Sequence, residues 1–306
     1  MTTPSVRDRI SVCICTFRRP ALLDRLLRAL ERQIAGEAFT FDVIVVDNDA
    51  GRTAESTAVA AGQRGIIDVR YDCEPEQNIS LTRNRAVRNA TGNLIAFIDD
   101  DEAPVPGWLA ALHGTLTACA ADGVLGPVIP EFAPGTPEWI QRGPFFHRRR
   151  LATGTAISAK DARTGNLLLD RAIFADGEPW FDPAFGRTGG EDSDFFWRQS
   201  RTGRRFVWCD EAAAYEVVPP ERCTASYHVK RYLRSGTLDG ERMRAGRLAS
   251  QGAIVRNAVI FCGCAAVAPF TLVLRKHIST RVFQKLAYCS GILTAYYGFS
   301  LLRYRD

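Results

Sequence analysis

The chain has 306 residues, of which 46% are hydrophobic and 24% are charged. A chain of this length can bury one large core, and this composition excludes an intrinsically disordered or a fibrous protein. Because residues 222–306 carry 14 Lys and Arg against 3 Asp and Glu, the net charge of +5 hides an acidic body joined to a basic tail, which we expect to meet an anionic surface.

The first hundred residues alternate between apolar strands and helices. Apolar runs predict strands at 10–16, 41–47, 66–71 and 93–99, and the spacing of leucines predicts a helix at 20–33. A second helix is expected at 80–90, with Ser80 as its N-cap. Strands that do not alternate with polar residues are buried on both faces. The pattern therefore predicts a doubly wound, mostly parallel α/β sheet with helices on both faces.

Polar side chains stand where three of these strands end. Thr16 ends the first strand, Asp47 ends the second, and four consecutive acids occupy 99–102 after the fourth. In a doubly wound sheet ligands bind outside the carboxyl ends of the strands, so we expect these residues to share one site. The chain has no GxGxxG after its first strand and no GxxxxGK[ST], which argues against dinucleotide-binding and P-loop proteins.

The four acids need an explanation, because crowded carboxylates repel one another and lose solvation near a core. Asp99 and Asp101 stand two residues apart at the mouth of a buried strand, and hard carboxylate oxygens suit Mg²⁺ or Mn²⁺. The alternative is an acidic N-terminus for the helix that GWLAALHGTL (107–116) begins, which would account best for Glu102.

The region from about 120 to 220 is less regular, with short strands expected at 164–171 and 204–210. Behind Gly189 and Gly190, Glu191 and Asp192 stand at the expected start of a helix. The helix dipole favours ionised carboxylates there, as a general base requires, although simple capping explains them equally. The basic residues 148–150 form either a lid over phosphates or a solvated loop. The aromatic residues Trp180, Phe185 and Trp197 either stack on a sugar or belong to the core.

Two long segments of the tail, 257–274 and 286–302, lack charges. Both are at the short limit for a membrane-spanning helix, which needs about 20 residues. If both spanned, the basic loop between them would face away from the cytoplasm, against the positive-inside tendency. Helices lying in the membrane plane, with their basic residues among anionic head groups, avoid this conflict. The alternative is two packed core helices.

The order of the motifs resembles that of family 2 glycosyltransferases with the GT-A fold, over about residues 8–215. The motifs are CTFRRP (15–20), VVDND (45–49), NISLTRNRA (78–86), FIDDDE (97–102), PGWL (106–109), GNLLL (165–169) and GGEDSDF (189–195). By this resemblance, Asp99 and Asp101 form the DxD motif, in which Asp101 binds the metal and Asp99 lies near the ribose and sugar. Asp47 would accept a hydrogen bond from uracil, Arg83 would lie beside the base, and Thr16 near the nucleotide.

The resemblance also implies which acid carries the reaction. Asp192 would be the catalytic base and Glu191 its neighbour in the acceptor site, while Asn84 matches the family's Arg-Asn pair. The chain departs from the family at Cys15, where proline is usual, and at Arg18, where asparagine is usual. These departures touch contacts of the first loop with the nucleotide and leave both acidic motifs intact.

Taken together, the expected activity is that of an inverting, metal-dependent hexosyltransferase of bacterial exopolysaccharide biosynthesis, similar to the β-glucosyltransferases that build succinoglycan-type polymers. The expected donor is a UDP-sugar, UDP-glucose by resemblance, with Mg²⁺ or Mn²⁺, and the expected acceptor is a saccharide on a polyprenyl diphosphate. The catalytic domain would be 1–220 and the membrane-association region 221–306.

The resemblance and the tail together give the expected setting of the protein. No apolar stretch at the N-terminus resembles a signal peptide, so we expect the cytoplasmic face of the inner membrane, with other polysaccharide-assembly proteins as possible partners. The alternatives are a nucleotidyltransferase or a catalytically silent scaffold. Nucleic acid is not an expected partner, because the basic tail is interrupted by long uncharged segments.

Overall fold

The computed structural model describes residues 7–34, 36–246, 251–273 and 275–299. The chain forms two compact units, each described here by itself. One unit comprises Met1–Pro130 and Arg148–Val217, and the other comprises Glu131–His147 and Val218–Asp306. The division into a catalytic domain, 1–220, and a membrane-association region, 221–306, stays a prediction.

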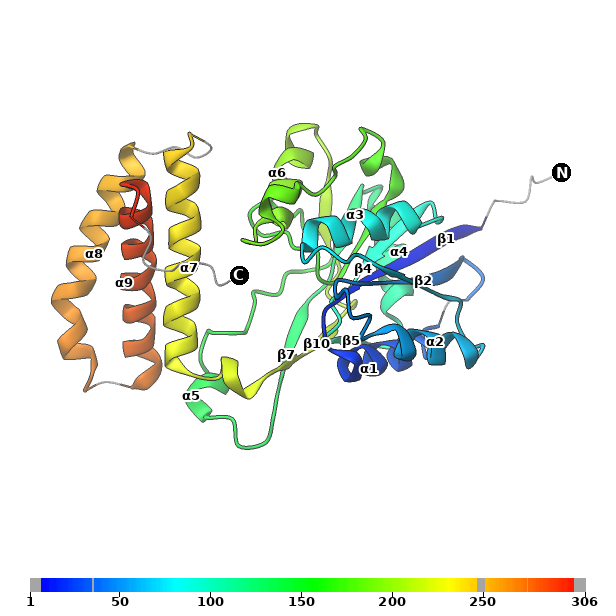
Figure 1. The fold of residues 1–306 in the computed structure, drawn as a ribbon, viewed down its shortest axis with the longest axis horizontal. Helices are drawn as coiled ribbons and strands as arrows, with labels where there is room; N and C mark the ends of the chain where they lie inside the picture. The colour runs from blue at the N-terminus through cyan, green and yellow to red at the C-terminus, as the bar shows by residue number, and fades with distance from the viewer. Residues whose placement is uncertain (1–6, 35, 247–250, 274, 300–306) are drawn as a thin grey trace. The chain divides into compact units, whose positions relative to one another are not determined.

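The first unit contains a seven-stranded sheet in the order β3-β2-β1-β4-β8-β6-β9, of which Figure 1 labels β1, β2 and β4. Neighbours among β1 to β4 are parallel, whereas β8 runs antiparallel to both β4 and β6. The predicted doubly wound, mostly parallel sheet is thus confirmed. The strands are β1 Asp8–Thr16, β2 Phe39–Asp47, β3 Val69–Cys73, β4 Leu94–Phe97, β6 Gly123–Leu125, β8 Leu167–Asp170 and β9 Phe206–Trp208.

The third strand begins three residues later than predicted. Ile66 was assigned to the strand for its apolar side chain, but that side chain is 60% exposed, and the chain enters the sheet only at Val69. A second, three-stranded sheet has the order β5-β10-β7, with β5 Glu102–Pro104, β10 Ala214–Val218 and β7 Val128–Phe132. The sequence analysis did not predict this sheet, because its strands are too short to show a period.

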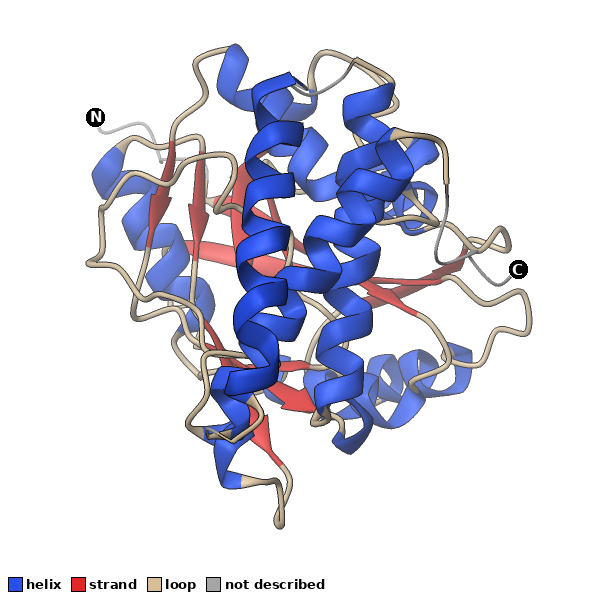
Figure 2. Ribbon diagram, turned by 90° about the vertical axis from the view of Figure 1, so that its left-hand side faces the viewer, coloured by secondary structure: helices blue, strands red, loops and turns tan. Residues whose placement is uncertain are grey.

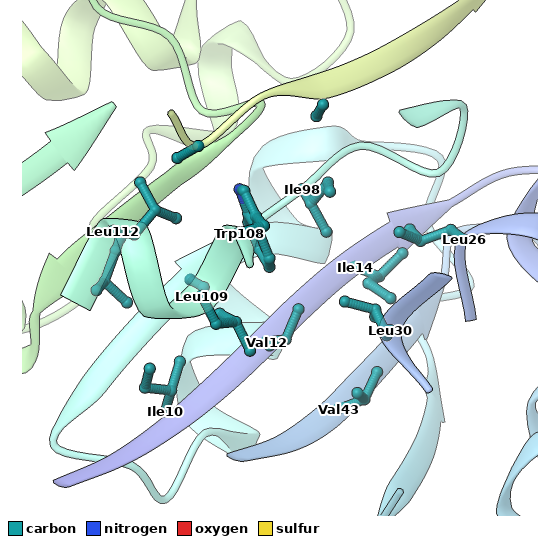
Figure 3. Packing of buried hydrophobic residues seen from close by; sticks show 14 of the residues in the cluster. Ile10, Val12, Ile14, Leu26, Leu30, Val43, Ile98, Trp108, Leu109 and Leu112 are labelled. Carbon is teal, nitrogen blue, oxygen red and sulfur yellow. The ribbon is translucent and has the colours of Figure 1, made fainter. Parts of the chain in front are cut away.

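Helices cover both faces of the large sheet. Leucines and alanines of α1 Pro20–Leu30, α2 Glu55–Gln63 and α4 Trp108–Cys119 pack on one face, in the core that Figure 3 shows. On the other face, α3 Ile79–Asn89 packs its Ala86 and Val87, and α6 Glu191–Arg201 packs its two phenylalanines. Successive strand residues point to opposite faces, so β1 contributes Val12 to the first core and Cys13 to the second.

The second unit is mainly helical. Besides the short α5 Glu138–Gln141, it contains α7 Ala225–Arg244, α8 Gln251–Thr271 and α9 Lys276–Tyr296, three long helices with α9 packed against both others (Figures 1 and 2). Glycines let α7 and α9 approach closely. A Cβ on Gly236 would lie only 2.0 Å from the carbonyl oxygen of Tyr288, and one on Gly291 only 2.4 Å from that of Leu233. Only hydrogen fits at either position.

The two uncharged segments of the tail differ in their surroundings. The stretch Gly252–Thr271 is apolar and long enough to cross a membrane, and only 17% of it is buried. In contrast, Ala287, Cys289, Ile292 and Ala295 of α9 are buried. Among the described residues, one helix rather than two meets the length and hydropathy of a membrane span, and whether either segment spans or lies in the membrane stays a prediction. Residues 274 and 300–302 of these segments lie outside the described residues.

Candidate active site

The four acids form the turn between the two sheets. The amide of Glu102 donates to the carbonyl oxygen of Asp99 (3.1 Å), and Glu102 then begins β5, where it pairs with Glu216 of β10. The helix α4 begins only at Trp108. The interpretation of the run as a helix N-terminus is therefore wrong, because Glu102 is a strand residue.

Two of these carboxylates share one cation supplied by the chain. Nη1 of Arg19 donates to Oδ1 of Asp100 and to Oδ2 of Asp101, both at 3.1 Å, and the hydroxyl of Thr16 donates to Oδ2 of Asp100 (2.8 Å). Both carboxylates are more than nine-tenths buried. The sequence analysis missed Arg19, whose only signal was its place between the first strand and Pro20 at the start of α1.

The other two carboxylates of the run lie against Gly165. A Cβ there would come within 2.8 Å of Oδ2 of Asp99 and 3.0 Å of Oε1 of Glu102. Burial raises the pKa of Asp99 to about 6 despite the opposing charge of Arg83, and burial likewise raises the pKa of Glu102 well above its usual range. Oε2 of Glu102 is buried without a hydrogen-bond partner. The glycine of the GNLLL motif thus leaves room for these two carboxylates.

The second acidic group stands at the N-terminus of α6. Gly189 and Gly190 precede it with φ of 85° and 97°, a conformation that suits glycine. Asp192 is partly exposed, and its Oδ1 accepts a hydrogen bond from the amide of Ser193 (2.7 Å). Glu191 is buried and pairs with Arg83 of α3. The helix therefore turns one acid outward and one inward.

Arg83 connects the two acidic groups. Its guanidinium forms the buried ion pair with Glu191, and it also favours the ionised form of Asp99. Although burial disfavours its charge, the carboxylates of Glu191, Asp99 and Asp192 together raise the pKa of Arg83. Residues from two distant parts of the chain thus surround one buried cation, and Arg83 and Glu191 are 108 positions apart.

Helix α3 also holds the segment that precedes the second acidic group. The side-chain Nδ2 of Asn84 donates to the carbonyl oxygen of Phe181 (2.8 Å), and its Oδ1 accepts from the backbone amide of Phe181 (2.9 Å). Asn78 donates to the carbonyl oxygen of Pro183 (3.0 Å). Asn78, not Ser80, is the N-cap, because its Oδ1 accepts from the amides of Ser80 and Leu81. The prediction of Ser80 was wrong by two residues.

Asp47 is fully buried at the end of β2. Its carboxylate accepts hydrogen bonds from the amides of Asp49 (3.1 Å) and Ala54 (2.8 Å) and from the hydroxyl of Tyr71 (3.2 Å). In this arrangement Asp47 shapes the loop that follows β2. Its contact with a uracil base stays a prediction.

One residue of the basic loop, 148–150, forms an ion pair within the protein. Arg150 makes a bidentate ion pair with Asp210, at 2.8 Å for each bond.

The three aromatic residues near the second acidic group differ in their exposure. Phe185 is buried, and Trp180 packs against the core and donates to the carbonyl oxygen of Phe174. Trp197 is 52% exposed on α6, with Arg201 over its ring. Of the three aromatic residues considered for a sugar, Trp197 is the most exposed.

The donor set fits a divalent ion whose shell is completed by the substrate. Within the described ranges, no three His, Cys, Asp or Glu side chains gather as a metal cage. Mg²⁺ and similar ions take one or two protein carboxylates and fill the remaining positions with phosphate oxygens and water. Asp101, whose carboxylate already attracts a cation in the form of Arg19, suits that kind of site.

Known proteins resemble the chain over most of its length. The model of the family described as glycosyl transferase family 2 matches residues 11–177. The succinoglycan biosynthesis protein ExoM of Rhizobium meliloti is 32% identical over 301 residues, which cover 95% of this chain and 94% of that protein.

Two solved structures share the fold. The mannosyltransferase PcManGT of Pyrobaculum calidifontis, in complex with GDP-Man and Mn²⁺, has a TM-score of 0.60 at 17% identity, covering 95% of this chain and 88% of that one. TarS 1–349 of S. aureus in complex with UDP-GlcNAc has a TM-score of 0.54 at 15% identity, covering 96% and 93%.

Proposed function

The chain belongs to glycosyl transferase family 2 and is related to a protein of succinoglycan biosynthesis, and from this premise we propose that it transfers a hexose from a UDP-sugar to a lipid-linked saccharide with inversion. The observation that carries the proposal is that Arg83 pairs with Glu191 and is also stabilised by the charges of Asp99, from the DxD motif, and of Asp192. A glycosyl transfer needs a donor site and a proton acceptor next to each other, and this arrangement supports such a pairing.

At the donor end, Asp101 would hold Mg²⁺ or Mn²⁺, and Asp99 would lie near the ribose and sugar. When bound, the ion neutralises the charge that develops on the diphosphate leaving group. Thr16 holds Asp100 through a hydrogen bond, so the turn keeps its shape while ligands come and go. Arg83, in the middle of α3, would lie beside the nucleotide base.

At the acceptor end, Asp192 would remove the proton from the attacking hydroxyl. Its partial exposure lets an acceptor reach it, and the dipole of α6 favours the ionised carboxylate that a base needs. The acceptor oxygen attacks the anomeric carbon on the face opposite the leaving diphosphate. This single displacement inverts the configuration, so an α-linked donor gives a β-glycoside. Glu191, fixed by Arg83, sets the start of the helix that carries Asp192.

The choice of UDP-glucose rests on the family relationship. One related fold was solved with GDP-Man and another with UDP-GlcNAc, so the fold alone does not select a base or a sugar. The proposed base contacts are Arg83 and the loop that Asp47 shapes. Glucose is proposed because the related protein belongs to succinoglycan biosynthesis.

We further propose that α8 anchors the protein at the cytoplasmic face of the inner membrane, where a polyprenyl-diphosphate-linked acceptor and other assembly proteins would meet it. Val255, Val259 and Phe270 of α8 are 65%, 67% and 75% exposed. Exposed apolar side chains on a helix whose single charged residue is Arg256 suit insertion at the head-group boundary. The exposed Arg275 and Lys276 that follow would face anionic lipids.

The proposal is tested by measuring UDP release from a panel of nucleotide sugars with the purified full-length protein, with Mn²⁺ or with EDTA. We expect release from one UDP-hexose, lost with EDTA. Asp192→Asn should bind UDP and Mn²⁺ but lose transfer, by about a thousandfold if it is the base. Asp194→Asn is the matched control, because Asp194 stands in the same helical turn and pairs with Arg198 (2.9 Å). Full transfer by Asp192→Asn would refute the assigned base.

A further inference from the structure

The position of Arg19 raises a question about the proposed metal ligand. Nη1 of Arg19 donates to Oδ2 of Asp101, the carboxylate assigned to the metal, and to Oδ1 of Asp100. A guanidinium and a divalent ion cannot both have full use of one carboxylate, because both are drawn to the same oxygen lone pairs. The chain therefore carries its own cation where the donor's metal would bind.

The surroundings of Arg19 allow its side chain to leave. Its side chain is 40% exposed, whereas those of Asp100 and Asp101 are 6% and 9% exposed. Thr16 keeps a second, independent hydrogen bond to Asp100, so that carboxylate stays in place without the arginine. The carboxylates are thus fixed and their counter-ion is on the solvent side.

We propose that Arg19 is an exchangeable counter-ion of the acid run. It pairs with Asp101 while no donor is bound, releases that carboxylate when the metal and nucleotide arrive, and then donates to the donor's diphosphate oxygens. The planar guanidinium suits phosphate oxygens as well as it suits carboxylates. This inference rests on the proposed function, since it needs a metal–diphosphate donor.

The inference predicts effects of opposite sign in one variant. In the full-length protein, Arg19→Gln should bind Mn²⁺ alone about three- to tenfold more tightly, because the competing cation is gone. The same variant should bind UDP, at saturating Mn²⁺, about tenfold more weakly, because a diphosphate contact is gone. Mn²⁺ binding is read from the electron paramagnetic resonance signal of the free ion, and UDP binding by calorimetry.

Two further variants sharpen the test. Arg28→Gln is the matched control, because Arg28 lies on α1 and its ion pair is with Asp24 (2.8 Å) and not with the acid run; neither affinity should change. Arg19→Lys keeps the charge and should leave the Mn²⁺ affinity near that of the wild type while weakening UDP. It also serves if Arg19→Gln does not fold.

The outcomes separate this inference from the proposed function. Weaker binding of both Mn²⁺ and UDP in Arg19→Gln, or no change in either, overturns the exchange while leaving the donor site standing. If the wild-type protein binds neither Mn²⁺ nor UDP, the proposed function fails and this inference fails with it.

Discussion

The buried pair of Arg83 and Glu191 offers a direct test of how the two acidic groups are held together. Arg83 is 8% exposed and Glu191 is 6% exposed, so neither charge can be solvated by water if its partner is removed. Breaking such a pair from one side costs about 3–5 kcal/mol, whereas replacing both partners by apolar residues is often close to neutral. We therefore expect Arg83→Met and Glu191→Leu each to lower the free energy of unfolding by about 3 kcal/mol.

The double variant should lose less than either single change, which gives a coupling of at least about 3 kcal/mol in a double-mutant cycle. The assay is urea unfolding of the purified protein. Arg88→Gln is the surface control on the same helix, because its pair with Glu178 (3.0 Å) is more than two-fifths exposed on both sides, and we expect less than about 0.5 kcal/mol. Losses that simply add would refute the coupling.

The same variants separate stability from activity. The double variant should fold but not bind UDP, because Arg83 is proposed to lie beside the base and supports the charge on Asp99. Wild-type UDP affinity in the folded double variant would show that Arg83 serves the fold alone.

Three more predictions concern stability, each read from urea or thermal unfolding. Gly236→Ala should lower the free energy of unfolding by about 2 kcal/mol, because its Cβ would meet the carbonyl oxygen of Tyr288 at 2.0 Å. This strain outweighs the gain of about 1 kcal/mol in helix propensity. The control Gly263→Ala, with nothing within 4 Å of its Cβ, should be neutral or stabilising. Burial lowers the pKa of His228 to about 4, so its neutral form stabilises the fold above pH 6.5 and up to about 3 kcal/mol is lost as pH falls from 6.5 to 4; His228→Leu should flatten that dependence. Asn166→Ala should cost about 3 kcal/mol, because the side chain is fully buried with three hydrogen bonds and the backbone has a φ of 57°.

The parallel part of the sheet could be predicted because its first two strands are long apolar runs with polar ends, whereas β6 Gly123–Leu125 is too short to be marked by the sequence. Around Ile14 the first strand does not alternate between apolar and polar residues. The sequence alone therefore predicts that both faces of this strand are buried. The sequence also predicted that Thr16 and the acid run lie close together, because the carboxyl ends of adjacent parallel strands lie at the same edge of a sheet. The structure places the hydroxyl of Thr16 2.8 Å from Asp100.

Other features of the structure depend on contacts between residues that are far apart in the chain or on the geometry of a loop, and the sequence does not show either. Asn78 and Ser80 are both good N-caps by composition, and only the geometry of the loop before α3 selects Asn78. The pairing of Arg83 with Glu191 spans 108 residues, and nothing local marks it. Both tail segments lack charges, and it is the packing of α9 against α7 and α8 that buries residues of the second segment.

The two acidic groups differ in how their charge is balanced, and that difference supports the assignment of their roles. The carboxylates of Asp100 and Asp101 are enclosed and share Arg19, so they are prepared for a cation. Asp192 is partly exposed and accepts hydrogen bonds from Ser193, its own neighbour, which suits the proposed role of proton acceptor. We therefore propose that the donor, whose diphosphate charge must be neutralised, binds beside Asp100 and Asp101. We propose that the acceptor, which enters from solvent, binds beside Asp192.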